Sequence, residues 1–264
     1  MAQPTNILTF LGTGTSVGVP MVGCECDVCT SDDPRNHRYR SSVLITTPEG
    51  NILIDTTPEL RLQMLREKVK LIHAVLYTHY HADHLFGLDD LRPFAKYLDR
   101  PVPLFCTSEV ERKIRQAFPY AFQQDSIKAP INTYLPKLSF QRISEDPFQV
   151  LGQTITPIPL IHNHFEVYGF RIGNVAYCTD VSEIPRESWQ LLQDLDVLVL
   201  DALRYKPHPA HLSLDQALDI ASQLKPKQAY FTHMSHEIDY NHVSERLPDN
   251  VNLAYDGLRI AFPS

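Results

Sequence analysis

The sequence predicts an α/β fold, a four-layer αββα sandwich formed by one domain over residues 1–264. Short apolar runs alternate with turn signals from the start of the chain, and helical patterns are interspersed among them. Both halves are rich in predicted strands, and no repeat, low-complexity tract or linker separates them. With 43% hydrophobic and 21% charged residues, the chain can bury a sizeable core.

The first half opens with an apolar run at 7–11, which predicts a strand. Gly12-Thr13-Gly14 follows it and is best interpreted as a tight turn between the first strands, because a phosphate-binding loop would also need a lysine and a following helix. Pro48-Glu49-Gly50 predicts a hairpin between strands at 43–46 and 51–54.

A helix is expected over 58–69, with Thr57-Pro58 as its cap and first turn. A strand at 74–77 and helices at 91–98 and 108–118 complete the first half. Residues 123–148 contain three prolines and are expected to form a surface excursion near the active site.

The second half repeats the scheme. Asp256-Gly257 predicts a hairpin between strands at 253–255 and 258–261. The helix expected over 214–224 has Ser213 as its cap. The remaining expected elements are strands at 155–158, 170–172, 175–178, 197–201 and 229–232, and a helix at 187–193.

The segment Thr78-His79-Tyr80-His81-Ala82-Asp83-His84 carries the clearest chemical signal. It holds three histidines and an aspartate, and it directly follows the strand predicted at 74–77. Imidazole and carboxylate are ligands that borderline divalent metals prefer. Alternate side chains of a strand share a face, so His79 and His81 are expected to point at one ion, and Asp83 and His84 can reach a second.

A two-metal centre needs further ligands, and the sequence offers them where apolar strands give way to loops. His162, Asp180 and His233 each end such a run. One residue of this kind would be unremarkable, but three after a histidine-rich cluster form a pattern. Zinc, manganese and iron all accept this donor set.

A second metal site is predicted at Cys24, Cys26 and Cys29, because three thiolates and a histidine make a closed tetrahedral zinc site. His236, three residues after His233, is the natural fourth ligand. The alternative is three free or redox-active thiols. The other two cysteines, Cys106 and Cys178, lie in apolar runs and are expected in the core.

Bulk properties narrow the function. The formal net charge of −7 argues against an extended nucleic-acid surface. No apolar run is long enough to span a membrane, the first residues do not form a signal peptide, and the cysteine usage favours a reduced, cytoplasmic setting. Arg35, Arg38 and Arg40 form a local basic patch that is either a phosphate contact or a solvated loop.

The residues 79–84 match the H-x-H-x-D-H signature of the metallo-β-lactamase fold superfamily. Over almost its whole length the chain resembles the phosphodiesterase branch, in particular the cyclic phosphodiesterases encoded with the carbon–phosphorus lyase system. The matching segments are Gly12–Ser16, the cysteine cluster, Gly87–Arg92, Tyr177–Asp180 and Thr232–His236.

The resemblance implies roles for individual residues. It places one ion on His79, His81 and His162, another on Asp83, His84 and His233, and Asp180 between the two. His164 is the alternative to His162, and Asp55 is expected to orient a ligand histidine rather than bind metal. His211 would be the general acid, with His208 as its alternative and Asp83 counted among the catalytic residues. His37 and His242 are expected at the surface.

The implied function is hydrolysis of small, possibly cyclic, phosphodiesters by a hydroxide held between two Zn or Mn ions, with one structural Zn elsewhere. The alternatives are a tRNA 3′-processing endonuclease and a thioester or lactone hydrolase on the same fold. The acidic balance disfavours the endonuclease. A homodimer is possible by analogy with the family.

Overall fold

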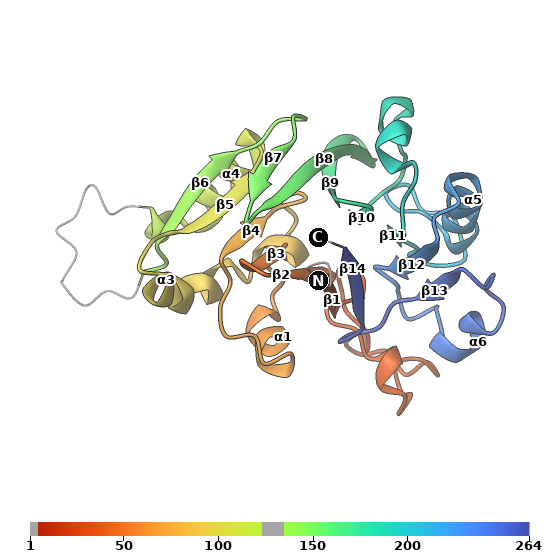
Figure 1. The fold of residues 1–264 in the computed structure, drawn as a ribbon. Coiled ribbons are helices and arrows are strands. Elements are labelled where there is room, and N and C mark those ends of the chain that lie inside the picture. Colours follow the sequence, from red (N-terminus) through yellow and green to blue (C-terminus); the bar gives the residue numbers. More distant parts are fainter. Residues whose placement is uncertain (1–4, 123–134, 264) are drawn as a thin grey trace.

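The computed structural model describes residues 5–122 and 135–263, which form two mixed seven-stranded sheets packed face to face (Figure 1). The first sheet has the order β14 (Arg259–Pro263), β1 (Thr5–Gly12), β2 (Ser42–Thr47), β3 (Gly50–Ile54), β4 (Ala74–Leu76), β5 (Val102–Cys106) and β6 (Leu138–Arg142). The second has the order β13 (Val251–Leu253), β12 (Gln228–Thr232), β11 (Val197–Asp201), β10 (Val175–Cys178), β9 (Phe165–Ile172), β8 (Gln153–His162) and β7 (Phe148–Val150).

Helices cover the outer faces of both sheets, which confirms the predicted αββα architecture (Figure 1). On the first sheet these are α1 (Leu60–Arg66), α3 (Arg92–Leu98) and α4 (Ser108–Ala117), and on the second α5 (Leu214–Leu224) and α6 (Tyr240–Ser244). The shorter helical elements are α2 (Ala82–Leu85), η1 (Pro34–Asn36), η2 (Leu88–Leu91), η3 (Pro119–Ala121) and η4 (Arg186–Leu192). Among the described residues, no helix is long and apolar enough to cross a bilayer.

Three buried apolar layers explain why the central strands are continuously hydrophobic. Along β11, Val197 and Val199 pack in the layer between the sheets, whereas Leu198 and Leu200 pack in the layer beneath α5. Successive side chains of a strand point to opposite faces, so a strand covered on both sides must be apolar at every position. The run at 197–200 is therefore a double-sided strand, and Asp201 is the first polar residue after it.

The parallel part of each sheet positions the functional residues. In the first sheet β3, β4 and β5 run parallel to one another, and in the second β10, β11 and β12 do the same. Parallel strands end at the same edge of a sheet, and ligand sites form outside those carboxyl ends. The polar residues that follow β4, β10 and β12 therefore lie close together, outside the carboxyl ends of these strands.

Several elements match the sequence predictions closely. The hairpin of β2 and β3 is confirmed, and α5 spans the predicted residues with a capping box between Ser213 and Gln216. Other elements differ from the prediction. Helix α1 begins at Leu60 rather than Pro58 and has Glu59 at its N-cap. Residues 186–192 form a 3₁₀ helix. Of the expected excursion 123–148, residues 123–134 lie outside the described residues, and Leu138–Arg142 forms the edge strand β6.

The hairpin predicted at Asp256-Gly257 is wrong. The strand before it, β13, pairs with β12 in the second sheet, and the strand after it, β14, pairs with β1 in the first sheet. The segment between them crosses from one sheet to the other. Asp256 is buried there and accepts hydrogen bonds from Thr13 Oγ1 (2.8 Å) and Tyr39 N (2.9 Å).

The tight turn predicted at Gly12-Thr13-Gly14 is also wrong, because a long connection over residues 13–41 joins β1 to β2. Instead, these two glycines allow another segment of the backbone to lie close to them. A Cβ atom on Gly12 would lie 1.9 Å from the carbonyl oxygen of Arg40, and one on Gly14 would lie 2.7 Å from that of Arg38. The two ends of this connection (residues 13–41, the Cys loop) therefore lie in close backbone contact.

Candidate metal centre

All seven predicted metal-ligand residues come together at the ends of strands. His79 and His81 lie in the loop after β4, which ends at Leu76 and so does not itself carry them as expected. Asp83 and His84 lie on the single turn of α2. His162 ends β8, Asp180 follows β10, and His233 follows β12.

The first group consists of His79, His81, His162 and Asp180, whose ligand atoms lie within 4.8 Å of one another. The imidazole rings meet edge to face or tilted, with centroids 4.6 Å apart for His79 and His81 and 5.1 Å apart for His81 and His162. His164, the alternative to His162, is exposed at the turn of the β8–β9 hairpin and belongs to no such group.

The second group consists of Asp83, His84, Asp180 and His233. His84 Nε2 lies 3.3 Å from Asp83 Oδ2 and 3.2 Å from Asp180 Oδ1, and His233 Nε2 lies 3.4 Å from Asp180 Oδ1. Two donors at 2.0–2.1 Å from one tetrahedral ion lie about 3.4 Å apart. The separations therefore fit donors that share a divalent ion.

Asp180 lies between the two groups. Its Oδ2 is the oxygen nearest to His79 and His162, at 3.9 Å from each Nε2, whereas its Oδ1 faces His84 and His233. One carboxylate thus presents one oxygen to each group. This is the arrangement that a bridging ligand requires.

Buried nitrogen atoms give an independent test of whether a metal fits. His79 Nε2, His84 Nε2 and both ring nitrogens of His233 are buried without a hydrogen-bond partner in the part of the chain that the structure describes. Leaving a buried polar atom unpaired costs free energy. Divalent cations would satisfy the three Nε2 atoms, so the residues fit a dinuclear centre.

The protonation of the cluster follows from its burial and its carboxylates. Burial lowers the pKa of His79 well below its usual range and that of His162 to about 4. Burial opposes protonation of His84 as well, but Asp180, Asp83 and Asp55 outweigh it and raise its pKa. Neutral imidazoles are the form that binds metal.

Asp55 contacts the ligand His84 at Nδ1, the ring nitrogen that does not face the cluster. His84 Nδ1 lies 2.8 Å from Asp55 Oδ2, and the carboxylate also accepts hydrogen bonds from Thr78 N (2.9 Å) and Thr78 Oγ1 (2.8 Å). The proton on Nδ1 leaves Nε2 free to face the cluster. The contact supports the orienting role predicted for Asp55.

Three residues of the site adopt left-handed backbone conformations. The φ angles are 65° at Asp55, 57° at Asp180 and 58° at His233. A non-glycine residue there is strained and persists only where its surroundings hold it in place. Each of them lies one or two residues after a strand, so the sheets hold the chain while it turns the side chain toward the cluster.

His211 lies beside the cluster and is oriented by a residue that the sequence analysis missed. Its Nδ1 is 3.1 Å from Asp201 Oδ2, and its Nε2 is 4.0 Å from Asp180 Oδ2. Asp201 is fully buried at the end of β11 and also accepts a hydrogen bond from Val181 N (3.2 Å). The signal that identified Asp180 and His233, a ligand-type residue ending an apolar strand, was present at Asp201 too.

His211 is mostly buried against other histidines. Its ring stacks on that of His233 with centroids 4.6 Å apart, and the tilted ring of His208 has its centroid 5.3 Å from that of His211. Burial and then the neighbouring His233 lower the pKa of His211 to about 4. Asp201, His211 and His233 also form a third group of possible ligands, so His211 can be a ligand or a proton donor on geometry alone.

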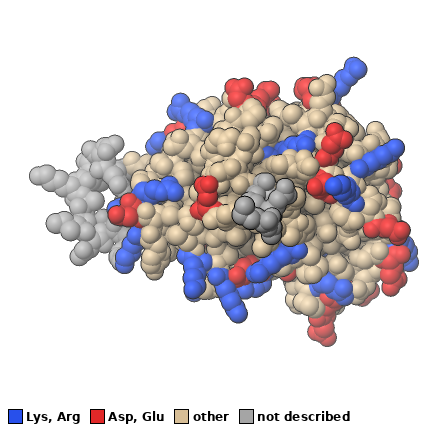
Figure 2. All heavy atoms as spheres, viewed as in Figure 1, with Lys and Arg blue, Asp and Glu red and all other residues tan. Residues whose placement is uncertain are grey.

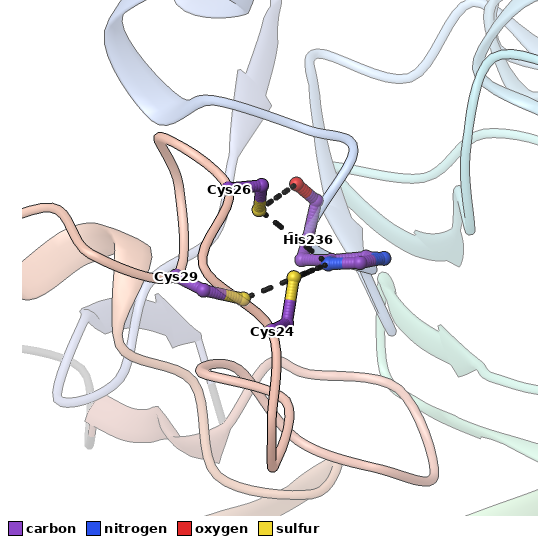
Figure 3. Close-up of side chains that lie close together, drawn as sticks. All are labelled: Cys24, Cys26, Cys29 and His236. Atoms are coloured by element: carbon purple, nitrogen blue, oxygen red, sulfur yellow. Dashed lines mark hydrogen bonds between the residues drawn. The ribbon is translucent and has the colours of Figure 1, made fainter.

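The four residues predicted for a structural zinc surround one point (Figure 3). His236 Nδ1 lies 3.0 Å from Cys24 Sγ, 3.5 Å from Cys26 Sγ and 3.6 Å from Cys29 Sγ. A sulfur at 2.3 Å and a nitrogen at about 2.05 Å from one tetrahedral zinc lie about 3.6 Å apart. The set could therefore hold a zinc ion, and all five cysteines are free of disulfides.

The arginines of the Cys loop do not form the basic patch that the sequence suggested. Arg38 is buried, Arg35 pairs with Asp33 at 2.7 Å, and Arg40 pairs with Glu59. On the face drawn in Figure 2, acidic and basic side chains are intermixed.

Comparison with known proteins agrees with this geometry. The family model described as a β-lactamase superfamily domain matches residues 50–234, which include all seven ligand residues of the His/Asp cluster. The chain belongs to the metallo-β-lactamase superfamily. A crystal structure of a diphosphatase from the PhnP family has 43% sequence identity and a TM-score of 0.90, and the alignment covers 98% of this chain and 97% of that one. This match assigns the chain to the PhnP family.

Two further relatives define the limits of the similarity. The zinc-bound PqqB structure from Methylobacterium extorquens has a TM-score of 0.79 but only 18% identity, with 96% and 99% of the chains covered, so it shows the shared fold. A protein named octanoyltransferase from Porphyromonas gingivalis is 37% identical over 94% of this PhnP-family chain. The chain spans about half the length of that relative, since 50% of it is covered.

Proposed function

We propose that this protein is a metal-dependent phosphohydrolase that cleaves a P–O bond in small phosphodiesters or diphosphate diesters. Its two ions would be held by His79, His81 and His162 on one side and by Asp83, His84 and His233 on the other, with Asp180 between them. Zn or Mn bound there would act as a Lewis acid toward the phosphoryl oxygens and lower the pKa of a bound water. The similarity to a PhnP-family diphosphatase supports phosphorus as the centre attacked.

The observation that carries the proposal is the pair of His211 and Asp201 beside the cluster. Attack on a phosphate diester expels an alkoxide, which needs a proton as the P–O bond breaks. His211 Nε2 faces the cluster, and an ionised Asp201 carboxylate on its Nδ1 would offset the burial that lowers the pKa of the ring. A dinuclear site with an oriented acid thus suits esters whose leaving group is a poor one. Asp83 contributes as a ligand to this chemistry.

The first experiment measures metal content per chain together with hydrolysis of bis(p-nitrophenyl) phosphate, a 2′,3′-cyclic nucleotide and a dinucleoside diphosphate. We expect two ions in the His/Asp cluster, one in the Cys₃His cluster, and turnover of at least one phosphate ester. Cleavage of an acyl thioester without any phosphate ester would overturn the proposal in favour of the acyl-hydrolase alternative. Cleavage of precursor tRNA alone would favour the endonuclease.

The general-acid role predicts a dependence on the leaving group. His211→Ala should slow hydrolysis of the cyclic nucleotide about 10²- to 10⁴-fold, because an alkoxide leaves only with a proton. The same change should affect bis(p-nitrophenyl) phosphate much less, since nitrophenolate is a good leaving group. His164→Ala is the matched control and should leave both rates unchanged, because that histidine is exposed at the hairpin turn. Equal losses on both substrates would remove His211 as the acid and favour a ligand role.

We also propose a cytoplasmic setting, a small-molecule substrate and an arrangement as a homodimer. The intermixed surface charges and the net charge of −7 support a small substrate over an extended nucleic acid.

A further inference from the structure

Arg38 is a buried charge with no carboxylate partner. Its side chain is 2% exposed, and no ion pair involves it among the described residues. Its guanidinium donates to uncharged groups only: Nη1 to the carbonyl of Ser235 (3.0 Å), and Nη2 to the carbonyl of Ile238 (2.7 Å) and to Asn36 Oδ1 (3.1 Å). Its Nε is buried and unpaired.

A buried guanidinium of this kind is unfavourable unless something compensates it. Burial lowers its pKa to about 10, so the group still carries its charge at neutral pH. The carboxylates around Arg38 already have other partners. Asp33 pairs with Arg35, Asp256 pairs with Arg66, and Asp239 caps α6 and accepts from Asn36.

Arg38 and the three thiols hold the same short segment of chain. The carbonyls of Ser235 and Ile238 lie on either side of His236, the residue on which Cys24, Cys26 and Cys29 converge. The Arg38 backbone also pairs with Val19 at 2.6 and 2.9 Å, and Val19 packs with Cys29 in a small apolar cluster. The guanidinium is therefore placed beside the Cys₃His cluster within one packed unit.

The Cys₃His cluster carries a negative charge whenever it holds a divalent ion. Each thiolate ligand contributes −1, the histidine is neutral, and the ion contributes +2, which leaves a net charge of −1. A single buried positive charge balances it. We propose that Arg38 is the counter-charge of the metal-loaded cluster and that its hydrogen bonds fix the segment 235–238 that supplies His236. This inference rests on the cluster holding a divalent metal, and it is independent of the reaction catalysed.

Metal affinity tests the inference without any activity measurement. Co²⁺ bound to thiolates gives a sulfur-to-metal charge-transfer band that the His/Asp cluster cannot give, so titration against a competing chelator reports the Cys₃His site alone. We expect Arg38→Met to weaken binding about 10- to 100-fold, the range for partners that support metal ligands. Arg35→Met, which removes a partly exposed guanidinium from the same loop, should leave the affinity unchanged.

A charge-matched cycle separates the counter-charge from a purely structural role. Cys26→His converts the cluster to two thiolates and two imidazoles, which is neutral with a divalent ion. In that background Arg38→Met should cost much less, because only the hydrogen bonds to segment 235–238 are lost and no negative charge remains to be balanced. An equal loss in both backgrounds would show that Arg38 acts only through its hydrogen bonds and would overturn the proposal.

Arg38→Lys keeps the measurement decisive if the methionine variant does not fold. Lysine retains the charge but not the fork of donors, so we expect its Co²⁺ affinity to stay within about tenfold of that of the unchanged protein. A larger loss, or the absence of any thiolate-bound metal in the unchanged protein, would also overturn the proposal.

Discussion

The His/Asp cluster and the Cys₃His cluster differ in what supports them. The first is built on the ends of strands in two sheets, and five of its seven residues, His79, His84, His162, Asp180 and His233, are no more than 3% exposed. The second is built largely on the Cys loop, whose only helical element is the single 3₁₀ turn η1, and Cys24 and Cys26 are partly exposed. The apolar cluster beneath it contains only Val19, Val28 and Cys29 as buried members.

The two clusters therefore differ in what fixes the positions of their ligand residues. At the His/Asp cluster the sheets impose the geometry, and they hold Asp55, Asp180 and His233 in strained backbone conformations. At the Cys₃His cluster the loop has too little core to fix itself, so a bound metal would supply much of the free energy that orders it. One site is a product of the fold, and the other contributes to it.

The largest effect is expected at the residue shared by both halves of the His/Asp cluster. Asp180→Asn retains the shape and tolerates the left-handed backbone, but it removes the charge that faces both groups. Paired-metal occupancy should fall, and activity should fall on the order of 10³-fold or more, as when a principal charge-stabilising group is lost. Metal analysis and steady-state rates check this, with the exposed Glu183→Ala as control. A fully active variant would rule out the bridging role.

Removal of the metal from the Cys₃His cluster should loosen the loop and spare the sheets. In Cys24→Ser, amide hydrogen exchange should accelerate across residues 13–41 and 235–238, whereas the central strands β3 and β11 should stay protected. The matched control is Glu25→Ser, an exposed neighbour that is not a ligand. If exchange in the sheets rose as much as in the loop, the contrast between the two sites would be wrong.

A smaller effect is expected at the residue that orients His211. Asp201→Asn should slow hydrolysis of esters with alkoxide leaving groups about 10- to 100-fold, because it removes the carboxylate that orients His211 and that would offset the low pKa of its ring. Metal content should remain unchanged if Asp201 acts only through His211. A loss of metal together with activity would instead identify Asp201, His211 and His233 as a ligand group.

The smallest effect is expected at Asp256, which joins the two ends of the Cys loop. Burial raises its pKa to about 6, against 3.8 in an unfolded chain. Between these values the folded state binds more protons than the unfolded state, so the contribution of Asp256 to stability falls as the pH rises from about 4 to about 6. The change is at most about 3 kcal/mol for a shift of about two pKa units.

Asp256→Asn cannot titrate, so its stability relative to the unchanged protein should improve over that pH range. Denaturant unfolding at a series of pH values measures the difference between the two proteins. A difference that is constant from pH 4 to pH 7 would contradict the buried, ionisable character of Asp256.

Much of the architecture was predictable from local sequence because local physics determines it. The capping box at Ser213, the double-sided strand at 197–201 and the β2–β3 hairpin each depend on neighbouring residues. The ligand residues were predictable for a related reason, since a polar residue at the end of a buried strand is conspicuous. Asp201 fits that rule and was overlooked because it belonged to no recognised motif.

The errors arose where a partner distant in sequence decides the outcome. Asp256-Gly257 has good hairpin chemistry, but the strands around it find their partners in different sheets. Gly12 and Gly14 suit a turn. Glycine is required there, however, because the backbone of Arg38–Arg40 lies too close to leave room for a side chain. The burial of Arg38 likewise depends on carbonyl groups about 200 residues away, which no local pattern encodes.

The pairing of β14 with β1 has a consequence for the order in which the protein can be assembled. Thr5 lies opposite Pro263, so β1 receives its outer neighbour from β14, at the opposite end of the described residues. Until residues 259–263 emerge, the backbone groups along that side of β1 have no partner within the sheet, and exposed strand edges of this kind recruit other chains. Loss of β14 would therefore appear as self-association along the exposed edge of β1.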